Sequence, residues 1–161
     1  MSEINIKQMY EIIAPIEQVW EVLTNTDNYY KWNPFVIKAE CSGESTQLGT
    51  MMNFIVQWHD GSSTKSKEEV IDVRLPAKLN NKEDIISATW VYSFRSFVNT
   101  IGMIKSIRTQ RLSQMHGHST KYYSEIKLSG WGKGLVPIEK IEIGMKAQAE
   151  GLINEIAKLK N

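Results

Sequence analysis

Hydrophobic and polar residues alternate at the start of the chain and again through most of its middle. In residues 3–13, one parity carries Ile4, Ile6, Tyr10 and Ile12, and the other carries Asn5, Lys7 and Glu11. A period of two is typical of a strand with one face against a core. Strand-like segments recur along the chain at 35–41, 50–58, 64–75, 85–94, 104–115 and 119–130. We therefore expect a sheet of about seven strands.

Residues 14–35 break this alternation. Pro15 is favoured at the first position of a helix, and the apolar residues after it recur at steps of three and four: Ile16, Val19, Trp20 and Leu23. Such a stripe predicts one amphipathic helix. Thr26 or Asp27 is expected to cap a second short helix, which must end just before Pro34.

A longer helical stripe closes the chain. After Pro137, apolar residues recur at three- and four-residue steps: Ile138, Ile141, Met145, Ala149, Leu152, Ile156 and Leu159. Gly144 and Gly151 project to one flank of this stripe. Because glycine weakens a helix, their presence indicates that a strand, a loop or a ligand comes close, or that the helix packs closely on the sheet.

The order of these elements predicts the fold class. Strands with few helices between them favour an antiparallel sheet, and such a sheet curves under its own twist. The long C-terminal helix is the only element able to cover the concave face. We expect one α+β domain over residues 1–161, with two short helices after the first strand and a polar loop at 76–84.

Composition excludes several classes of function. The chain has 19 basic and 18 acidic residues and a net charge of +1, without the basic stripe of a nucleic-acid-binding protein. Cys41 is the only cysteine, so neither an intrachain disulfide nor a thiolate metal cluster can form. The N-terminus lacks the features of a signal peptide, and no apolar run is long enough to insert stably in a membrane. We expect a cytoplasmic protein, and the sequence does not determine its oligomeric state.

Motifs for catalysis and metal binding are missing. His59, His116 and His118 lie in predicted turns, without a cysteine cluster or a helical histidine pair beside them. The run from Gly130 to Gly134 lacks the Gly-Lys-Ser/Thr ending of a phosphate loop. We find no serine nucleophile motif and no carboxylate pair placed for acid–base work. The sequence therefore assigns no catalytic residue, no metal and no cofactor.

Aromatic residues gather on the strand faces that we expect to point at the helix. These are Trp58, Trp90, Tyr92, Phe94 and Tyr122, with Met52 and Phe54 beside them. Because one helix covers only part of such a sheet, the set either lines a cavity or forms ordinary core. Arg108 shares a parity with apolar neighbours and is a candidate polar anchor, whereas Glu125 is expected to face water.

These residues resemble the START-like superfamily, also called SRPBCC, and within it the polyketide cyclase/dehydrase-like proteins. The resemblance spans the chain and is carried by Ala14-Pro15, Val19-Trp20, Asp27, Trp32-Asn33-Pro34, Arg108, Gln110, Arg111-Leu112, Thr120, Tyr122 and Gly130. The chain departs from the pattern at His118-Ser119-Thr120 and in a longer loop at 76–84. The resemblance implies a helix-grip fold with an elongated apolar cavity, closed at one end by the two short helices.

The same resemblance implies binding of a small hydrophobic ligand, such as a lipid, a sterol, a polyketide or an aromatic compound. The expected cavity residues are Met52, Phe54, Trp58, Trp90, Tyr92, Phe94, Arg108, Tyr122 and Met145, and those at its mouth, as a lid or a plug, are Tyr29, Tyr30, Trp32 and Phe35. Two alternatives remain open. One is a cyclase or dehydratase in which a tyrosine or Arg108 polarises a carbonyl, and the other is a protein-binding module.

Overall fold

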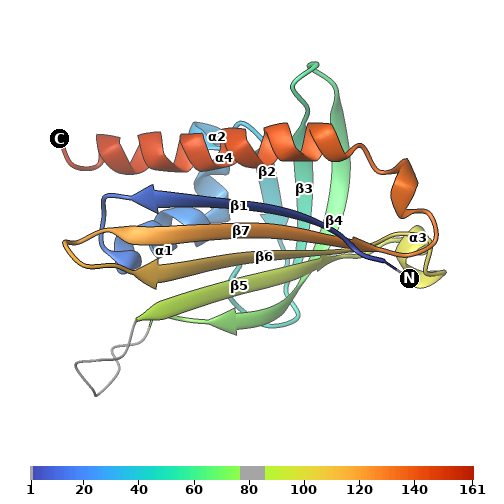
Figure 1. Ribbon diagram of the computed structural model, residues 1–161, viewed down its shortest axis with the longest axis horizontal. Helices are drawn as coiled ribbons and strands as arrows, with labels where there is room; N and C mark the ends of the chain where they lie inside the picture. The colour runs from blue at the N-terminus through green and yellow to red at the C-terminus, as the bar shows by residue number, and fades with distance from the viewer. Residues whose placement is uncertain (1, 77–85) are drawn as a thin grey trace.

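A curved antiparallel sheet lies along one long helix in the computed structural model, which describes residues 2–76 and 86–161 (Figure 1). The strands are β1 (Ile4–Ile12), β2 (Val36–Cys41), β3 (Met51–Gln57), β4 (Ser63–Arg74), β5 (Ser87–Phe94), β6 (Lys105–Gln114) and β7 (Thr120–Ser129). Their order across the sheet is β1-β7-β6-β5-β4-β3-β2, and every neighbouring pair is antiparallel. The α+β helix-grip prediction is confirmed.

Short helices connect the strands at the ends of the sheet, and a long one closes the chain. They are α1 (Ile16–Thr24), η1 (Thr26–Asn28), α2 (Tyr29–Trp32), α3 (Phe97–Thr100), η2 (Lys133–Leu135) and α4 (Ile138–Lys158). Figure 1 places the start of α4 near α3, and α1 toward the other end of the sheet. The polar loop expected at 76–84 lies, apart from Pro76, outside the described residues. No helix in the described ranges has the length and apolarity to span a membrane.

The first helical region follows its predicted stripe but not its predicted cap. Ile16, Val19 and Leu23 are fully buried, as the spacing indicates. The expected cap at Thr26 or Asp27 is wrong, because no side chain caps η1 or α2. The Thr26 hydroxyl instead lies 3.4 Å from the sulfur of Cys41, so it is used to join this turn to β2.

Two irregularities in strand pairing bend the sheet. The register of β2 shifts between Val36 and Lys38, and that of β4 shifts between Val70 and Asp72. A bulge increases the local twist and bends its strand. It also changes which parity faces the core, so Val36 is buried beside Phe35 although strict alternation predicts that only one of them points inward.

Helix α4 buries the predicted stripe and approaches the segment after α2 very closely. The stripe is buried from Ile141 to Ile156, whereas Leu159 is exposed. A Cβ atom at Gly151 would overlap the carbonyl oxygen of Trp32, and one at Gly144 would overlap the ring of Phe35. Of the alternatives that the sequence leaves open, close approach of a loop is therefore correct.

The contact at Gly151 gives a stability prediction. Gly151→Ala adds a methyl group against main-chain atoms that no rotamer change can move, so we expect a loss of about 2 kcal/mol in unfolding free energy. This loss outweighs the gain of up to about 1 kcal/mol from the better helix propensity of alanine. Urea denaturation measures both effects together.

Gly134→Ala is the control for this substitution. Gly134 has open space around its Cα and lies outside α4, so we expect a change within about 0.5 kcal/mol. Equal stability of Gly151→Ala and the wild-type protein would show that α4 does not need this close approach.

Candidate functional site

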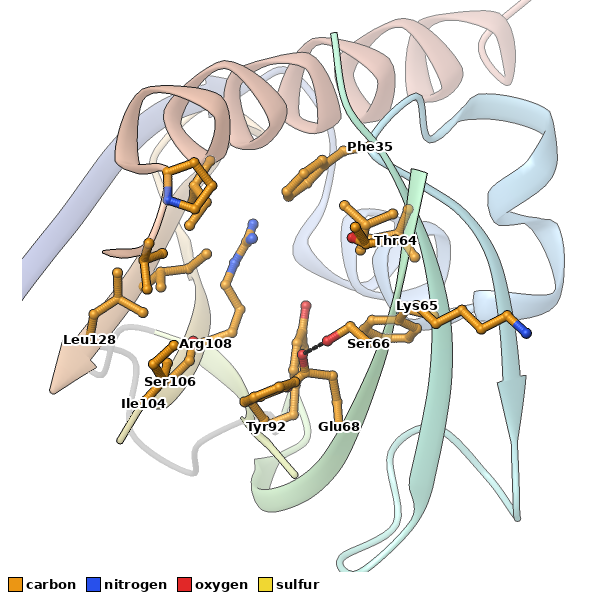
Figure 2. Close-up of a pocket in the computed structure, with 18 of the residues that line it drawn as sticks. Phe35, Thr64, Lys65, Ser66, Glu68, Tyr92, Ile104, Ser106, Arg108 and Leu128 are labelled. Carbon is orange, nitrogen blue, oxygen red and sulfur yellow. Dashed lines mark hydrogen bonds between the residues drawn. The ribbon is translucent and has the colours of Figure 1, made fainter. Parts of the chain in front are cut away.

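A cavity of about 310 Å³ lies between the sheet and the first turns of α4 (Figure 2). Its walls are mainly apolar and come from three sides. The sheet contributes Phe54, Val56, Tyr92, Ile126 and Leu128, and the helix side contributes Val136, Pro137 and Ile141. Trp58 and Thr64, on the β3–β4 hairpin, and Val98 of α3 also line it.

The position of α4 explains why the protein is hollow at this place. Toward its C-terminal end, Met145, Ala149 and Leu152 are packed into the core with almost no exposure. The first turns instead cross the cavity. They are held to the β3–β4 hairpin by an ion pair of 2.7 Å between the Nζ atom of Lys140 and the Oδ2 atom of Asp60. The helix thus covers the cavity, held by core packing toward its C-terminal end and by the Lys140–Asp60 ion pair near its start.

The structure brings some of the expected ligand-binding residues together and leaves others in the core. Those that line the cavity are Phe54, Trp58, Tyr92, Phe94 and Arg108. Those that do not are Met52, Trp90, Tyr122 and Met145, which are almost completely buried elsewhere in the core. All lie on inward-facing positions, but the cavity occupies only the part of the sheet under the start of α4. Ligand binding by any of them stays a prediction.

Hydrogen bonds satisfy the polar atoms of two of the core aromatic residues. The indole N–H of Trp90 donates to the carbonyl oxygen of Ser45 at 2.9 Å. The hydroxyl of Tyr122 donates to Oε1 of Gln110 at 2.5 Å. Both residues therefore have partners within the protein and present no free polar group to the cavity.

The four residues expected at the cavity mouth occupy different environments. Tyr29 is buried, and its hydroxyl donates to the carbonyl oxygen of Leu23 at 2.6 Å. Trp32 packs edge-on against the Tyr29 ring, with centroids 5.2 Å apart. Tyr30 points to the surface and is 69% exposed. Tyr29 and Trp32 fill the end of the core, and Phe35 is the member of the four that lines the cavity.

Arg108 brings a positive charge into the cavity from β6. It is only 5% exposed, and its Nη2 atom donates to Oγ of Ser124 at 2.8 Å and to Oε1 of Gln148 at 3.3 Å. Burial opposes the charge, but Tyr92 and Tyr122 favour it, and the pKa of Arg108 lies above its ordinary value. The side chain is therefore a permanently charged group in the wall of an apolar cavity.

Tyr92 is a second polar group in the wall. Its hydroxyl oxygen accepts a hydrogen bond of 3.2 Å from Nε2 of Gln110. Burial raises the pKa of Tyr92 well above the ordinary value of a phenol, so the hydroxyl keeps its proton. Because this hydroxyl acts as an acceptor toward Gln110, its own hydrogen can point to a molecule in the cavity.

Glu68 is among the cavity residues that the sequence analysis missed, and it is the acidic one of those that the structure describes. It extends from β4, and Figure 2 shows it near Tyr92, with its Oε1 atom accepting a hydrogen bond of 2.6 Å from Oγ of Ser66. Burial raises its pKa to about 7, against the opposing effects of the Ser66 hydrogen bond and the positive charges of Arg108 and Arg95. This carboxyl group changes its charge near neutral pH.

A signal for Glu68 is present in the sequence, although it is weak. Glu68 shares a parity with Val70, which is buried, and with Ser66, which also lines the cavity. A strand that is polar over most of its length gives no apolar face from which to infer the direction of a glutamate.

The residues His116, His118 and Cys41 do not line the cavity. His116 and His118 are exposed in the β6–β7 turn, and within residues 2–76 and 86–161 no three metal-ligating side chains of the His, Cys, Asp and Glu types cluster. Burial raises the pKa of the Cys41 thiol, although a hydrogen bond with Thr26 opposes this. A raised pKa keeps the thiol protonated and poorly nucleophilic.

Comparison of the sequence with known protein families and with curated proteins finds no match. Solved structures do match. A norcoclaurine synthase mutant from Thalictrum flavum superposes with a TM-score of 0.71 and 14% identity, over 99% of this chain and 98% of that chain. A major latex-like protein from Panax ginseng gives 0.69 and 11% identity, over 95% and 97%.

The di-domain aromatase/cyclase BexL, from the BE-7585A biosynthetic pathway, gives a TM-score of 0.66 and 12% identity. The match covers 94% of this chain and 49% of that one, so this chain corresponds to about half of BexL. At these identities, the likeness establishes the fold alone: this chain shares the helix-grip architecture of these proteins.

Glu68 leads to a prediction about pH. Its raised pKa means that the folded protein binds this proton more tightly than the unfolded chain does. The bound proton therefore stabilises the folded state fully at pH values below 4.5, the ordinary pKa of a glutamate. This stabilisation is lost as the pH rises through the folded-state pKa of about 7. We expect Glu68→Gln to be more stable than the wild-type protein above pH 7 by about 1–3 kcal/mol, and no more stable at pH 4.

Urea denaturation between pH 4 and pH 8.5 measures this difference. Glu11→Gln, at an exposed position of β1, is the control for removal of one negative charge. A stability difference between Glu68→Gln and the wild-type protein that does not change with pH would contradict the assignment.

Proposed function

We propose that this chain, which has the START-like helix-grip fold, binds a small hydrophobic molecule in the cavity under the first turns of α4. The observation that carries the proposal is the cavity itself, about 310 Å³ in volume with mainly apolar walls. The cavity is partly open to solvent, so a ligand has a route into it. A space of this kind with a few polar groups is the usual form of a small-molecule site.

The size and the aromatic walls favour a compact ligand. The volume is at the lower end of the roughly 300–1,000 Å³ found for ligand pockets, which suits one or two fused rings better than a long acyl chain. Phe54, Trp58 and Tyr92 present aromatic rings to the space. Among the structures with the same fold, a norcoclaurine synthase holds dopamine and hydroxybenzaldehyde. Small aromatic compounds are therefore the first probes to test.

Filling the cavity tests this proposal. Ile141 lines the cavity from α4, so Ile141→Trp places an indole ring in the space that a ligand would occupy. We expect the fluorescent neutral probe N-phenyl-1-naphthylamine to bind the wild-type protein, and to bind Ile141→Trp at least tenfold more weakly. Fluorescence titration measures both dissociation constants.

Ile143→Trp is a matched control on the same helix. Ile143 is exposed and does not line the cavity, so the probe should bind this variant as it binds the wild-type protein. Unchanged binding to Ile141→Trp would show that the probe sits elsewhere, and absence of binding to the wild-type protein would remove the main support for the proposal.

Glu68 favours a second function, proton-transfer catalysis of the cyclase or dehydratase type in the same cavity. A carboxyl group with a pKa of about 7 is suited to act as a general acid or base at neutral pH. Tyr92 and Arg108, which line the same cavity, supply hydrogen-bond donors that could polarise a carbonyl group of the substrate.

Exchange of the α-protons of 2-tetralone with deuterated water tests this second function. The reaction needs a base and a polarised carbonyl, and NMR follows it directly. If Glu68 acts as the base, Glu68→Gln should lose at least about 100-fold in rate while it still binds N-phenyl-1-naphthylamine. An exchange rate equal to that in buffer would leave ligand binding as the proposed function.

A further inference from the structure

Arg108 carries a buried charge that forms no direct ion pair with the described residues. Within residues 2–76 and 86–161, no carboxylate oxygen lies within 4.0 Å of its guanidinium nitrogens. Its Nε atom and the Nε2 atom of Gln148 are both buried without a hydrogen-bond partner in the same ranges. A buried charge with unused donors is unfavourable in a folded protein unless another group compensates it.

Arg108 lines the ligand space, whereas Gln148 lies behind it and does not line the cavity. Figure 2 shows the Arg108 side chain extending from β6 across the cavity toward α4. Tyr92 is its register partner on β5, and the hydroxyl hydrogen of Tyr92 is not used in its bond with Gln110. One part of this mainly apolar cavity therefore presents a positive charge and a neutral O–H donor.

We propose that the cavity selects an amphipathic acid, with an apolar body and one anionic oxygen group, such as a carboxylate, that binds at Arg108 and Tyr92. The inference rests on the proposed function and specifies the chemistry of its ligand. The anion would supply the countercharge that Arg108 lacks, and the apolar walls would cover the rest of the molecule. Charge-assisted hydrogen bonds to a buried guanidinium are among the strongest in proteins.

A purely structural role does not account for Arg108. Its two hydrogen bonds go to the neutral side chains of Ser124 and Gln148, which a neutral residue could also join. Arg111 on the same strand shows the ordinary alternative, since it is exposed and lies over the ring of Tyr123 at 5.7 Å.

The alternative is a cationic ligand, which would have to bind at the carboxylate that Glu68 contributes to the cavity wall. However, Glu68 already accepts the hydroxyl hydrogen of Ser66. Arg108 lines the same cavity and would repel a second cation. Arg108 is buried and, in the part of the chain that the structure describes, has no carboxylate partner within 4.0 Å, and such a cation favours an acid.

A pair of nearly isosteric probes tests the proposal. 2-Naphthaleneacetic acid and 2-naphthaleneacetamide differ in charge but hardly in shape. At pH 6, where Glu68 with its pKa of about 7 is mostly protonated and does not repel an anion, we expect the wild-type protein to bind the acid at least tenfold more tightly than the amide, as a charge-assisted hydrogen bond implies. Isothermal titration calorimetry measures both dissociation constants.

Arg108→Met should bind the acid and the amide with similar affinity, while Arg111→Met should keep the preference of the wild-type protein. Without ligand, Arg108→Met should also unfold at the same temperature as the wild-type protein or higher, because it removes a buried unpaired charge. A residue needed only to hold the fold would have the opposite effect. If Arg108→Met does not fold, Arg108→Gln gives the same comparison of the two probes.

The outcomes separate this inference from the proposed function. Equal affinity of the wild-type protein for acid and amide, with N-phenyl-1-naphthylamine also binding, would overturn the inference alone. Failure of all three probes to bind would overturn the proposed function and the inference with it. A preference for the acid that survives in both Arg108 variants would place the anion elsewhere and would also overturn the inference.

Discussion

The close approach of α4 to the segment between α2 and β2 determines the rest of the structure. Glycine at 144 and 151 lets the helix axis come nearer to Trp32 and Phe35 than a side chain would allow. The helix is thereby fixed at one end of the concave sheet, where its apolar stripe completes the core. Its first turns must then extend over a part of the sheet that curves away, and the space between them stays open.

The cavity end of the domain also contains ionisable side chains. Glu68, Tyr92 and Arg108 come from three neighbouring strands, β4, β5 and β6, and line one cavity. A core packed to ordinary density would leave no room for a partly uncompensated guanidinium and a carboxyl group of raised pKa. Their presence means that stability is lower here than an apolar core would give, a pattern that is common at sites selected for function.

The sequence predicts the fold well, because the relevant patterns are local. Alternation identifies the inward face of β3, with Met52, Phe54 and Val56 buried, and the helical stripe identifies the inward face of α4. Which inward residues meet the cavity depends on where α4 crosses the sheet, and no local pattern records this crossing. Trp90 and Tyr92 share a face, yet only Tyr92 lines the cavity. Glu68 escaped prediction because its strand is mostly polar and contains a bulge two residues further on.

The cavity also has a mechanical consequence. Side chains around this space of about 310 Å³, which is partly open to solvent, lack packing partners on one side. The region around Leu152 and Ile156, which are almost completely buried, has partners on all sides. A bound molecule would restore the missing contacts. Occupancy of the cavity is therefore coupled to mechanical stiffness at one end of the domain.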